Sequence, residues 1–202
     1  MRTALLRGSV LAVAVSTALT AGLTSTATSA SAAPTVAAAV TVQALPPRET
    51  WLADVRAVTD QAAAYLATRL PAGGIRAAIV LDIDNTALQS KYKPYDATPS
   101  VLALARQARD AGAVVFFVTA RPEIIKPATE LNLKSVGYQW VDLYARPTFN
   151  FDDNQTLKTK ARIDIERRGY TIVANVGNSA TDLGGGHAER TFKLPDYDGQ
   201  LD

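Results

Sequence analysis

The 202-residue sequence contains no cysteine and a single histidine. Without cysteine the protein cannot form disulfide bonds, use a thiolate as a catalyst, or bind zinc through thiolate ligands. Its stability must therefore come from the burial of apolar surface. The histidine, His187, follows Gly184-Gly185-Gly186. We interpret it as a surface or structural residue, because the chemistry described below does not require it.

The sequence also has little net charge, with 21 Lys and Arg against 19 Asp and Glu. Residues 1–32 contain two arginines and no acidic residue, so the remainder carries 19 charges of each sign. A chain that is neutral overall has no electrostatic footprint for nucleic acid or for an anionic membrane. We therefore expect neither as a partner.

Residues 1–32 have the features of a signal peptide. Two arginines precede an apolar run at residues 10–19, and Ala30-Ser31-Ala32 provides the small residues of a cleavage site. We predict a secreted protein that is cleaved near Ala32. The apolar run is short and interrupted by hydroxyl residues, which argues against stable membrane insertion. A retained anchor is the alternative.

The rest of the chain is expected to form a flexible leader, residues 33–47, and one domain, residues 48–202. Apolar and polar segments alternate in the way that is typical of a parallel sheet with helices on both faces. We predict an α/β fold, specifically a Rossmann-like three-layer α/β/α arrangement with a mostly parallel sheet. The expected elements are a helix from Glu49, strands at 77–82, 113–118, 140–145, 171–176 and 190–194, and helices near 99–111, 122–136 and 156–168.

The segment Asp82-Ile83-Asp84-Asn85-Thr86 directly follows the aliphatic run Ala77–Leu81. If the run is a buried strand, both carboxylates lie at the carboxyl edge of the sheet, where open α/β folds bind ligands. Two aspartates in a loop can also simply cap a turn. Next to a purely aliphatic strand, however, they are costly to desolvate unless a cation or hydrogen bonds compensate. We therefore favour a role in phosphoryl chemistry.

This segment resembles the first signature of the haloacid dehalogenase (HAD) superfamily, whose members are mostly aspartate-dependent phosphohydrolases. The second signature is a hydrophobic strand that ends in a hydroxyl residue, here Val114–Val118 followed by Thr119. Ala120, Arg121 and Pro122 come next, and Pro122 suits the first position of a helix. Thr119 is then expected at the end of the strand, either as a phosphate ligand or as an ordinary helix cap.

The third signature is a lysine, and both Lys158 and Lys160 are available near the start of the predicted helix at 156–168. Lys160 has Asp164 four residues later as an ion-pair partner, which is a sufficient structural reason for its presence. Lys158 instead has Arg162, a like charge, at that spacing. We therefore favour Lys158 over Lys160 as the phosphate ligand.

The fourth signature is Gly177-Asn178-Ser179-Ala180-Thr181-Asp182, which follows a predicted strand. Asp182 can supply an oxygen to a hard divalent cation. Asn178 stands where the family usually has aspartate, and a neutral amide adds no charge, so we expect weaker metal binding. A simple turn with a capping aspartate is the alternative.

The resemblance implies attack by Asp82 on a phosphomonoester, with an aspartyl-phosphate intermediate that water hydrolyses. Asp84 would act as the general acid and then as the base, which requires a proton that it shares with a neighbouring carboxylate. The implied cofactor is Mg²⁺, bound by Asp82, Asp182 and the backbone carbonyl of Asp84. Phosphate would be bound by Thr119, Ala120 and Lys158, with Arg121 and Asn178 as further possible site residues.

Finer similarities narrow the resemblance to the secreted class B-type acid phosphatases, a group that includes plant vegetative storage proteins. Some of those storage proteins have lost the nucleophile, whereas this chain keeps Asp82, which favours an enzyme. Phosphotransfer to an alcohol, and a weakly active or non-catalytic storage or phosphate-binding protein, remain alternatives. The gaps between signatures leave room for a minimal cap only, so we expect an open site with broad specificity for small phosphomonoesters. The segments that carry the finer similarity are Ala78–Leu88, Glu130–Leu133 with Gly137-Tyr138, Ile165–Tyr170 and Thr191–Pro195.

Overall fold

The computed structural model describes residues 44–201, so the predicted signal peptide and most of the predicted leader lie outside the described residues. The described residues belong to one compact unit. Among the described residues, no helix is both long enough and apolar enough to cross a membrane.

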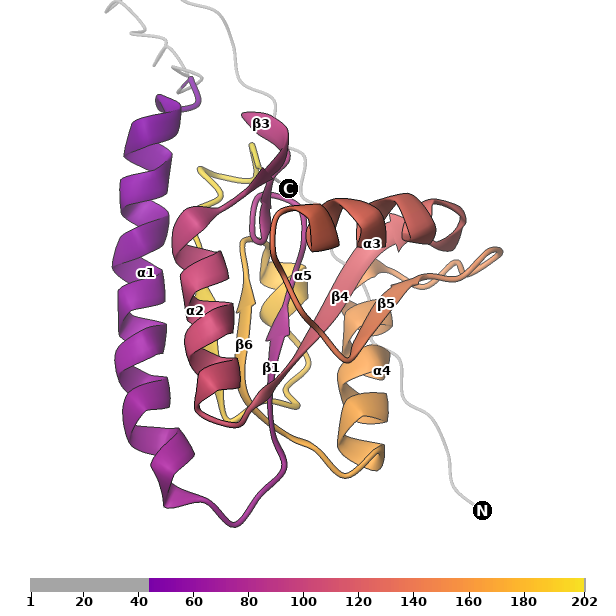
Figure 1. The fold of residues 1–202 in the computed structure, drawn as a ribbon. Coiled ribbons are helices and arrows are strands. Elements are labelled where there is room, and N and C mark those ends of the chain that lie inside the picture. The colour runs from indigo at the N-terminus through magenta and orange to yellow at the C-terminus, as the bar shows by residue number, and fades with distance from the viewer. Residues whose placement is uncertain (1–43, 202) are drawn as a thin grey trace, which may run out of the picture. The chain divides into compact units, whose positions relative to one another are not determined.

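A parallel sheet forms the centre of this unit, with strand order β5-β4-β1-β6-β7. All four neighbouring pairs of strands are parallel, and β1 lies in the middle of the sheet (Figure 1). The strands are β1 (Ala77–Leu81), β4 (Val114–Pro122), β5 (Asp142–Arg146), β6 (Thr171–Gly177) and β7 (Arg190–Lys193). The helices are α1 (Arg48–Arg69), α2 (Pro99–Asp110), α3 (Lys126–Ser135), α4 (Asn154–Arg167) and α5 (Ala180–Leu183), with short 3₁₀ turns at Leu70–Ala72 and Glu123–Ile125.

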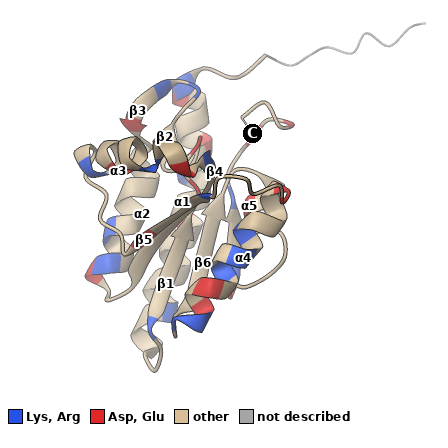
Figure 2. Cartoon of the chain, turned by 90° about the vertical axis from the view of Figure 1, so that its right-hand side faces the viewer, with Lys and Arg blue, Asp and Glu red and all other residues tan. Residues whose placement is uncertain are grey.

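Helices cover both faces of the sheet, because successive strand residues point to opposite faces and are apolar on both. Ile79 and Leu81 face α1 and α2, where they share a core with Trp51. Ala78 and Val80 face α4, where they pack with Ile165. Charged residues lie on the helices, the loops and the outer strands, whereas the central strands β1 and β6 contain none (Figure 2). The predicted three-layer α/β/α fold with a mostly parallel sheet is confirmed.

Three local features differ from the sequence-based expectation. Strand β4 continues to Pro122, which has extended backbone angles, so the helix predicted from residue 122 begins as an α-helix only at Lys126. A small antiparallel hairpin, β2 (Leu88–Gln89) with β3 (Lys93–Ala97), follows β1 where no helix or strand was predicted. A one-turn helix, α5, follows β6, where no helix was predicted.

Candidate active site

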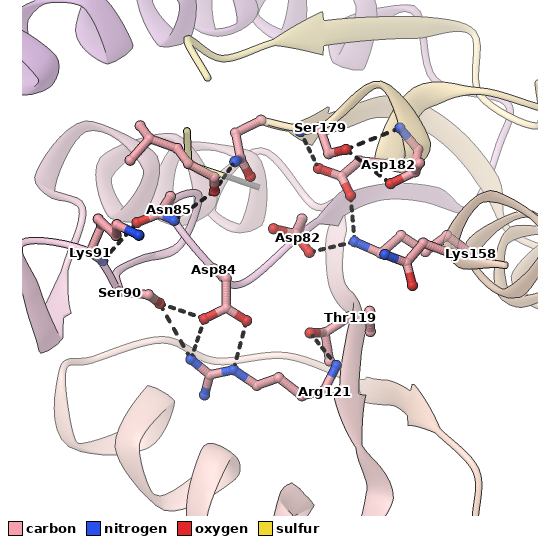
Figure 3. Close-up of a pocket in the computed structure, with 15 residues that line it drawn as sticks. Asp82, Asp84, Asn85, Ser90, Lys91, Thr119, Arg121, Lys158, Ser179 and Asp182 are labelled. Carbon is pink, nitrogen blue, oxygen red and sulfur yellow. Dashed lines mark hydrogen bonds and ion pairs between the residues drawn. The ribbon is translucent and has the colours of Figure 1, made fainter. Parts of the chain in front are cut away.

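A cavity of about 440 Å³ opens at the carboxyl edge of the sheet, where β1, β4 and β6 end beside the start of α4 (Figure 3). It is formed where the topology predicts, because the carboxyl ends of parallel strands meet at one edge. All eight site residues predicted from the sequence line this cavity, namely Asp82, Asp84, Thr119, Ala120, Arg121, Lys158, Asn178 and Asp182.

Lys158 bridges two buried carboxylates at the floor of the cavity. Its Nζ donates to Asp82 Oδ1 at 2.8 Å and also to Asp182 Oδ1. The three side chains are 7% exposed or less, so each charge depends on the others for compensation. Three chain segments that are distant in sequence therefore meet at this point, as the sequence predicts.

The electrostatics of this cluster follow from two carboxylates sharing one ammonium group. Burial raises the pKa of Asp82 to about 7; Lys158 opposes this shift and the charge of Asp182 adds to it. Burial alone would lower the pKa of Lys158, but the charges of Asp82 and Asp182 outweigh it and raise that pKa. Lys158 therefore stays protonated, while Asp82 holds its negative charge less readily than an exposed aspartate.

Helix α4 directs Lys158 inward and Lys160 outward. Lys160 is largely exposed and pairs with Asp152 at 2.8 Å. The expected Lys160–Asp164 pair is therefore wrong, because Asp164 accepts a hydrogen bond from Tyr144 instead. The structure brings Lys158, the favoured lysine, to Asp82.

Arg162 does not oppose Lys158 as a like charge, as the helical spacing suggested. It is fully buried, and its guanidinium donates to the backbone carbonyls of Asp182, Gly184 and Gly186. These carbonyls follow or end the short helix α5, where a cation is favoured by the helix dipole. Arg162 therefore fixes the end of helix α5, which carries Asp182, and the glycines that follow it.

Asp182 is also fixed by its own helix and by Gly177. It forms a capping box with Ser179, in which Asp182 Oδ2 accepts the Ser179 backbone N–H at 2.8 Å. The Asp182 side chain lies directly over Gly177, and a Cβ at position 177 would overlap it. A glycine at the end of β6 is therefore required for Asp182 to reach Lys158.

Asp84 is bound by Arg121 through both of its oxygens, at 2.7 and 2.8 Å, and by the Ser90 hydroxyl at 2.5 Å (Figure 3). Partial burial opposes the charge on Asp84, but the hydrogen bonds from Arg121 and Ser90 outweigh it, so the pKa of Asp84 is lowered. The expectation that Asp84 shares a proton with a second carboxylate is therefore wrong for this arrangement, because its nearest partner is a guanidinium.

Thr119 lies within β4 and does not cap the following helix. Its Oγ1 accepts the Arg121 backbone N–H at 3.1 Å, which leaves the hydroxyl hydrogen available to a ligand in the cavity. Thr119 is only 1% exposed, so a hydrogen bond donated there is well shielded from water.

Asn178 has two partners that the sequence did not indicate. Its Oδ1 accepts from the Thr86 hydroxyl at 3.0 Å, and its Nδ2 donates to the Leu201 carbonyl at 2.8 Å. Asn85, Ser90 and Leu201 line the cavity and were not predicted as site residues. The one sequence signal for Asn85 was its position directly after Asp84.

The oxygen donors of this cavity fit a hard cation such as Mg²⁺ in part. Lys158 engages Oδ1 of Asp82, and the hydrogen bonds among the described residues leave Asp82 Oδ2 facing the cavity. Within residues 44–201, however, no three carboxylate, histidine or cysteine side chains are grouped as a metal site. A cation here would depend on one carboxylate oxygen, the Asp84 backbone carbonyl and Asp182.

Comparison with known proteins identifies the fold and the family. The sequence model of a family described as HAD superfamily, subfamily IIIB (Acid phosphatase) matches residues 91–200. The match begins after the segment with Asp82 and Asp84. The structure of the class C acid phosphatase from Bacillus anthracis superposes with a TM-score of 0.56 and 20% sequence identity, covering 69% of this chain and 67% of that one. At that identity it shows a shared fold.

Curated relatives include plant storage proteins. The Stem 28 kDa glycoprotein of Glycine max is 36% identical over 104 residues, which cover 49% of this chain and 41% of that protein. Vegetative storage protein 1 of Arabidopsis thaliana is 31% identical over 98 residues, which cover 48% of this chain and 36% of that protein. The chain thus spans about two fifths of the length of these relatives.

Proposed function

Because this chain belongs to the acid phosphatase subfamily IIIB of the HAD superfamily, we propose that it is a phosphomonoesterase whose nucleophile is Asp82. The observation that carries this proposal is the position of Asp82. It follows the central strand β1, one oxygen is held by Lys158, and the other faces a cavity lined by polar groups. An oxygen fixed in this way can attack a phosphorus atom in line with the leaving group.

The phosphoryl group is bound by groups that surround Asp82. Lys158 neutralises negative charge, and the Thr119 hydroxyl donates to a phosphoryl oxygen. Thr119, Ala120 and Arg121 all line the cavity, and the backbone around Ala120 is part of the proposed phosphate-binding site. Attack forms the Asp82 acyl phosphate and releases the alcohol, and water then breaks the acyl phosphate to give inorganic phosphate and free Asp82.

Asp84 is proposed to donate a proton to the leaving alcohol and later to accept one from water. Its two bonds to Arg121 must loosen first, because they favour the charged form. A substrate phosphate is an equally good bidentate partner for a guanidinium. Arg121 therefore turns to the phosphate when substrate binds, which frees Asp84 to take up a proton.

We also propose Mg²⁺ as the cofactor, with Asp82, Asp182 and the Asp84 backbone carbonyl as ligands. When bound, it neutralises charge between the nucleophile and the phosphate. We propose further that residues 1–32 direct secretion. The small β2–β3 hairpin near the cavity is consistent with an open site that accepts varied small phosphomonoesters.

A second candidate, a storage or phosphate-binding protein, is favoured by the similarity to vegetative storage proteins of Arabidopsis thaliana and by Asn178. Turnover of a generic aryl phosphate, with and without added Mg²⁺, separates the two, and Asp82→Asn is the control. We expect turnover by the parent protein and none above background by Asp82→Asn. Equal, background-level rates for both proteins would contradict the enzymatic proposal.

Two further assays refine the proposal. A screen of phosphate esters tests its breadth, and a strong preference for one ester would contradict an open, permissive site. Product analysis with a competing alcohol distinguishes hydrolysis from phosphotransfer. Hydrolysis yields the released alcohol and inorganic phosphate, whereas phosphotransfer yields the released alcohol and a new phosphate ester of the added alcohol.

A further inference from the structure

The segment Asp196–Leu201, here named the latch segment, is hydrogen-bonded to the active site through its last residue, Leu201. The Leu201 carbonyl accepts hydrogen bonds from Asn85 Nδ2 at 2.7 Å and from Asn178 Nδ2 at 2.8 Å. Asn85 directly follows Asp84 in the chain, and Asn178 lies just before helix α5, which carries Asp182. One carbonyl therefore joins two of the loops that form the cavity.

Both amides are buried and are hydrogen-bonded through the nitrogen and through the oxygen. Asn85 is 5% exposed and Asn178 is 2% exposed. The Oδ1 of Asn85 accepts the Lys91 backbone N–H at 2.8 Å, and the Oδ1 of Asn178 accepts the Thr86 hydroxyl. Each amide thus uses its oxygen within the active-site loops and its nitrogen on Leu201. A carbonyl oxygen has two lone pairs, so it can accept both bonds.

This geometry explains why residue 178 is an amide. A carboxylate at this position can accept the Thr86 hydroxyl, but it cannot donate to Leu201. It would instead place a charged oxygen against a carbonyl oxygen in a buried site, which costs free energy. The substitution of Asn for the usual aspartate is therefore accounted for by the latch segment, independently of any metal.

The rest of the latch segment is anchored at several points. The Leu201 N–H donates to the Asp196 carbonyl at 3.1 Å, and Asp196 pairs with Lys193 at 2.7 Å. The Tyr197 hydroxyl donates to Asp54 on α1 at 2.7 Å. The Leu201 residue is 1% exposed, belongs to the hydrophobic core and lines the cavity.

We propose that Asn85 and Asn178 are positioning residues that hold the latch segment against the active site, so that Leu201 forms one wall of the substrate cavity. The consequence for catalysis rests on the proposed function, whereas the attachment of the segment does not. Loss of either amide donor releases Leu201 and opens that wall. Substrate binding then weakens, while Asp82 and Lys158 remain in place.

Hydrogen exchange of the Gln200 and Leu201 amides tests the attachment without any substrate. We expect exchange at least about tenfold faster in Asn178→Asp, Asn178→Ala and Asn85→Asp, because each variant lacks one buried donor. Amides of β1 and β6 report whether a variant is folded. If the Asn178 variants do not fold, Asn85→Asp still decides the question, because it keeps the oxygen that accepts from Lys91.

Asn132→Asp is the matched control. Asn132 Nδ2 donates to the Tyr95 carbonyl at 2.9 Å on the surface, so the same chemical change is made away from the cavity. We expect exchange at Gln200 and Leu201 to be unchanged in this variant. Equal acceleration in Asn132→Asp, or no acceleration in the three test variants, would overturn the proposal.

Two further measurements distinguish a role of Asn178 in holding the latch segment from a role of residue 178 as a metal ligand. With an aryl phosphate, Asn178→Ala should raise KM several-fold and change kcat by less than about threefold. Mg²⁺ titration of Asn178→Asp by calorimetry gives a second readout. Tighter Mg²⁺ binding with unchanged exchange at Leu201 would identify residue 178 as a metal-ligand position and overturn the latch. Fast exchange in a protein without phosphatase activity would support the latch and reject the proposed function.

Discussion

Removal of the Lys158 ammonium should destabilise the protein far more than removal of the nearby Lys160 ammonium. In Lys158→Met, Asp82 and Asp182 lose the cation that both contact, and each stays in a site that is almost fully buried. Breaking a buried ion pair by removing one partner costs about 3–5 kcal/mol. Lys160 is 64% exposed and forms an ion pair with Asp152 at the surface, so Lys160→Met should cost at most about 1 kcal/mol.

The loss in Lys158→Met should depend on pH in a defined direction. Burial already raises the pKa of Asp82 from 3.8 to about 7, and without Lys158 this pKa rises further. The folded protein then binds more protons than the unfolded chain at pH values above about 4. Its stability therefore falls as pH rises through this window, and the destabilisation is larger at pH 8 than at pH 5.

Urea unfolding of both variants at pH 5 and pH 8 measures these effects. The double variant Lys158→Met/Asp82→Asn should recover at least about 1 kcal/mol of the loss, because one of the uncompensated charges is removed. A loss below about 1 kcal/mol in Lys158→Met, or a larger loss at pH 5 than at pH 8, would refute the description of this cluster as a buried, charge-compensated set.

Three other perturbations test the site. Gly177→Ala should lower kcat at least about tenfold with a folded protein by circular dichroism, because a methyl group at residue 177 displaces Asp182; full activity would show that the contact is easily relieved. Mg²⁺ affinity, measured by calorimetry, should fall as pH drops below about 7, because a proton on Asp82 competes with the cation; affinity independent of pH would argue against Asp82 as a ligand. Arg121→Met should raise KM at least about tenfold and raise the pKa of Asp84 in NMR titration; an unchanged pKa would remove Arg121 as the cause of its charged state.

The strands and the site residues could be predicted because their signals are local. An aliphatic run followed by carboxylates, as at Asp82, specifies a buried strand and the edge at which it ends. Parallel topology then brings the ends of such strands together without any knowledge of side-chain contacts. Thr119 and Asp182 were assigned to the site from the second and fourth signatures of the resemblance, and the parallel topology explains why those segments meet Asp82.

The partners of these residues were much harder to predict, because they are distant in sequence. Asp84 is 37 residues from Arg121, and Asn178 is 23 residues from Leu201. The helical i,i+4 rule suggested Asp164 for Lys160, but it cannot detect competition from a tyrosine on β5 or an acid in the preceding loop. The β2–β3 hairpin was missed because two residues are too few to show an alternating pattern, and β3 is exposed along most of its length.

Helix α4 carries Lys158 and Arg162 one turn apart, and the two cations reach separate targets in the same region. Because a helix advances by about 100° per residue, one residue inserted between them would turn one cation away from its target whatever the rest of the helix does. The four-residue spacing thus sets the distance between the cation at the floor of the cavity and the cation that binds the end of helix α5. The spacing between these two positions of α4 is therefore fixed by the two targets that Lys158 and Arg162 reach.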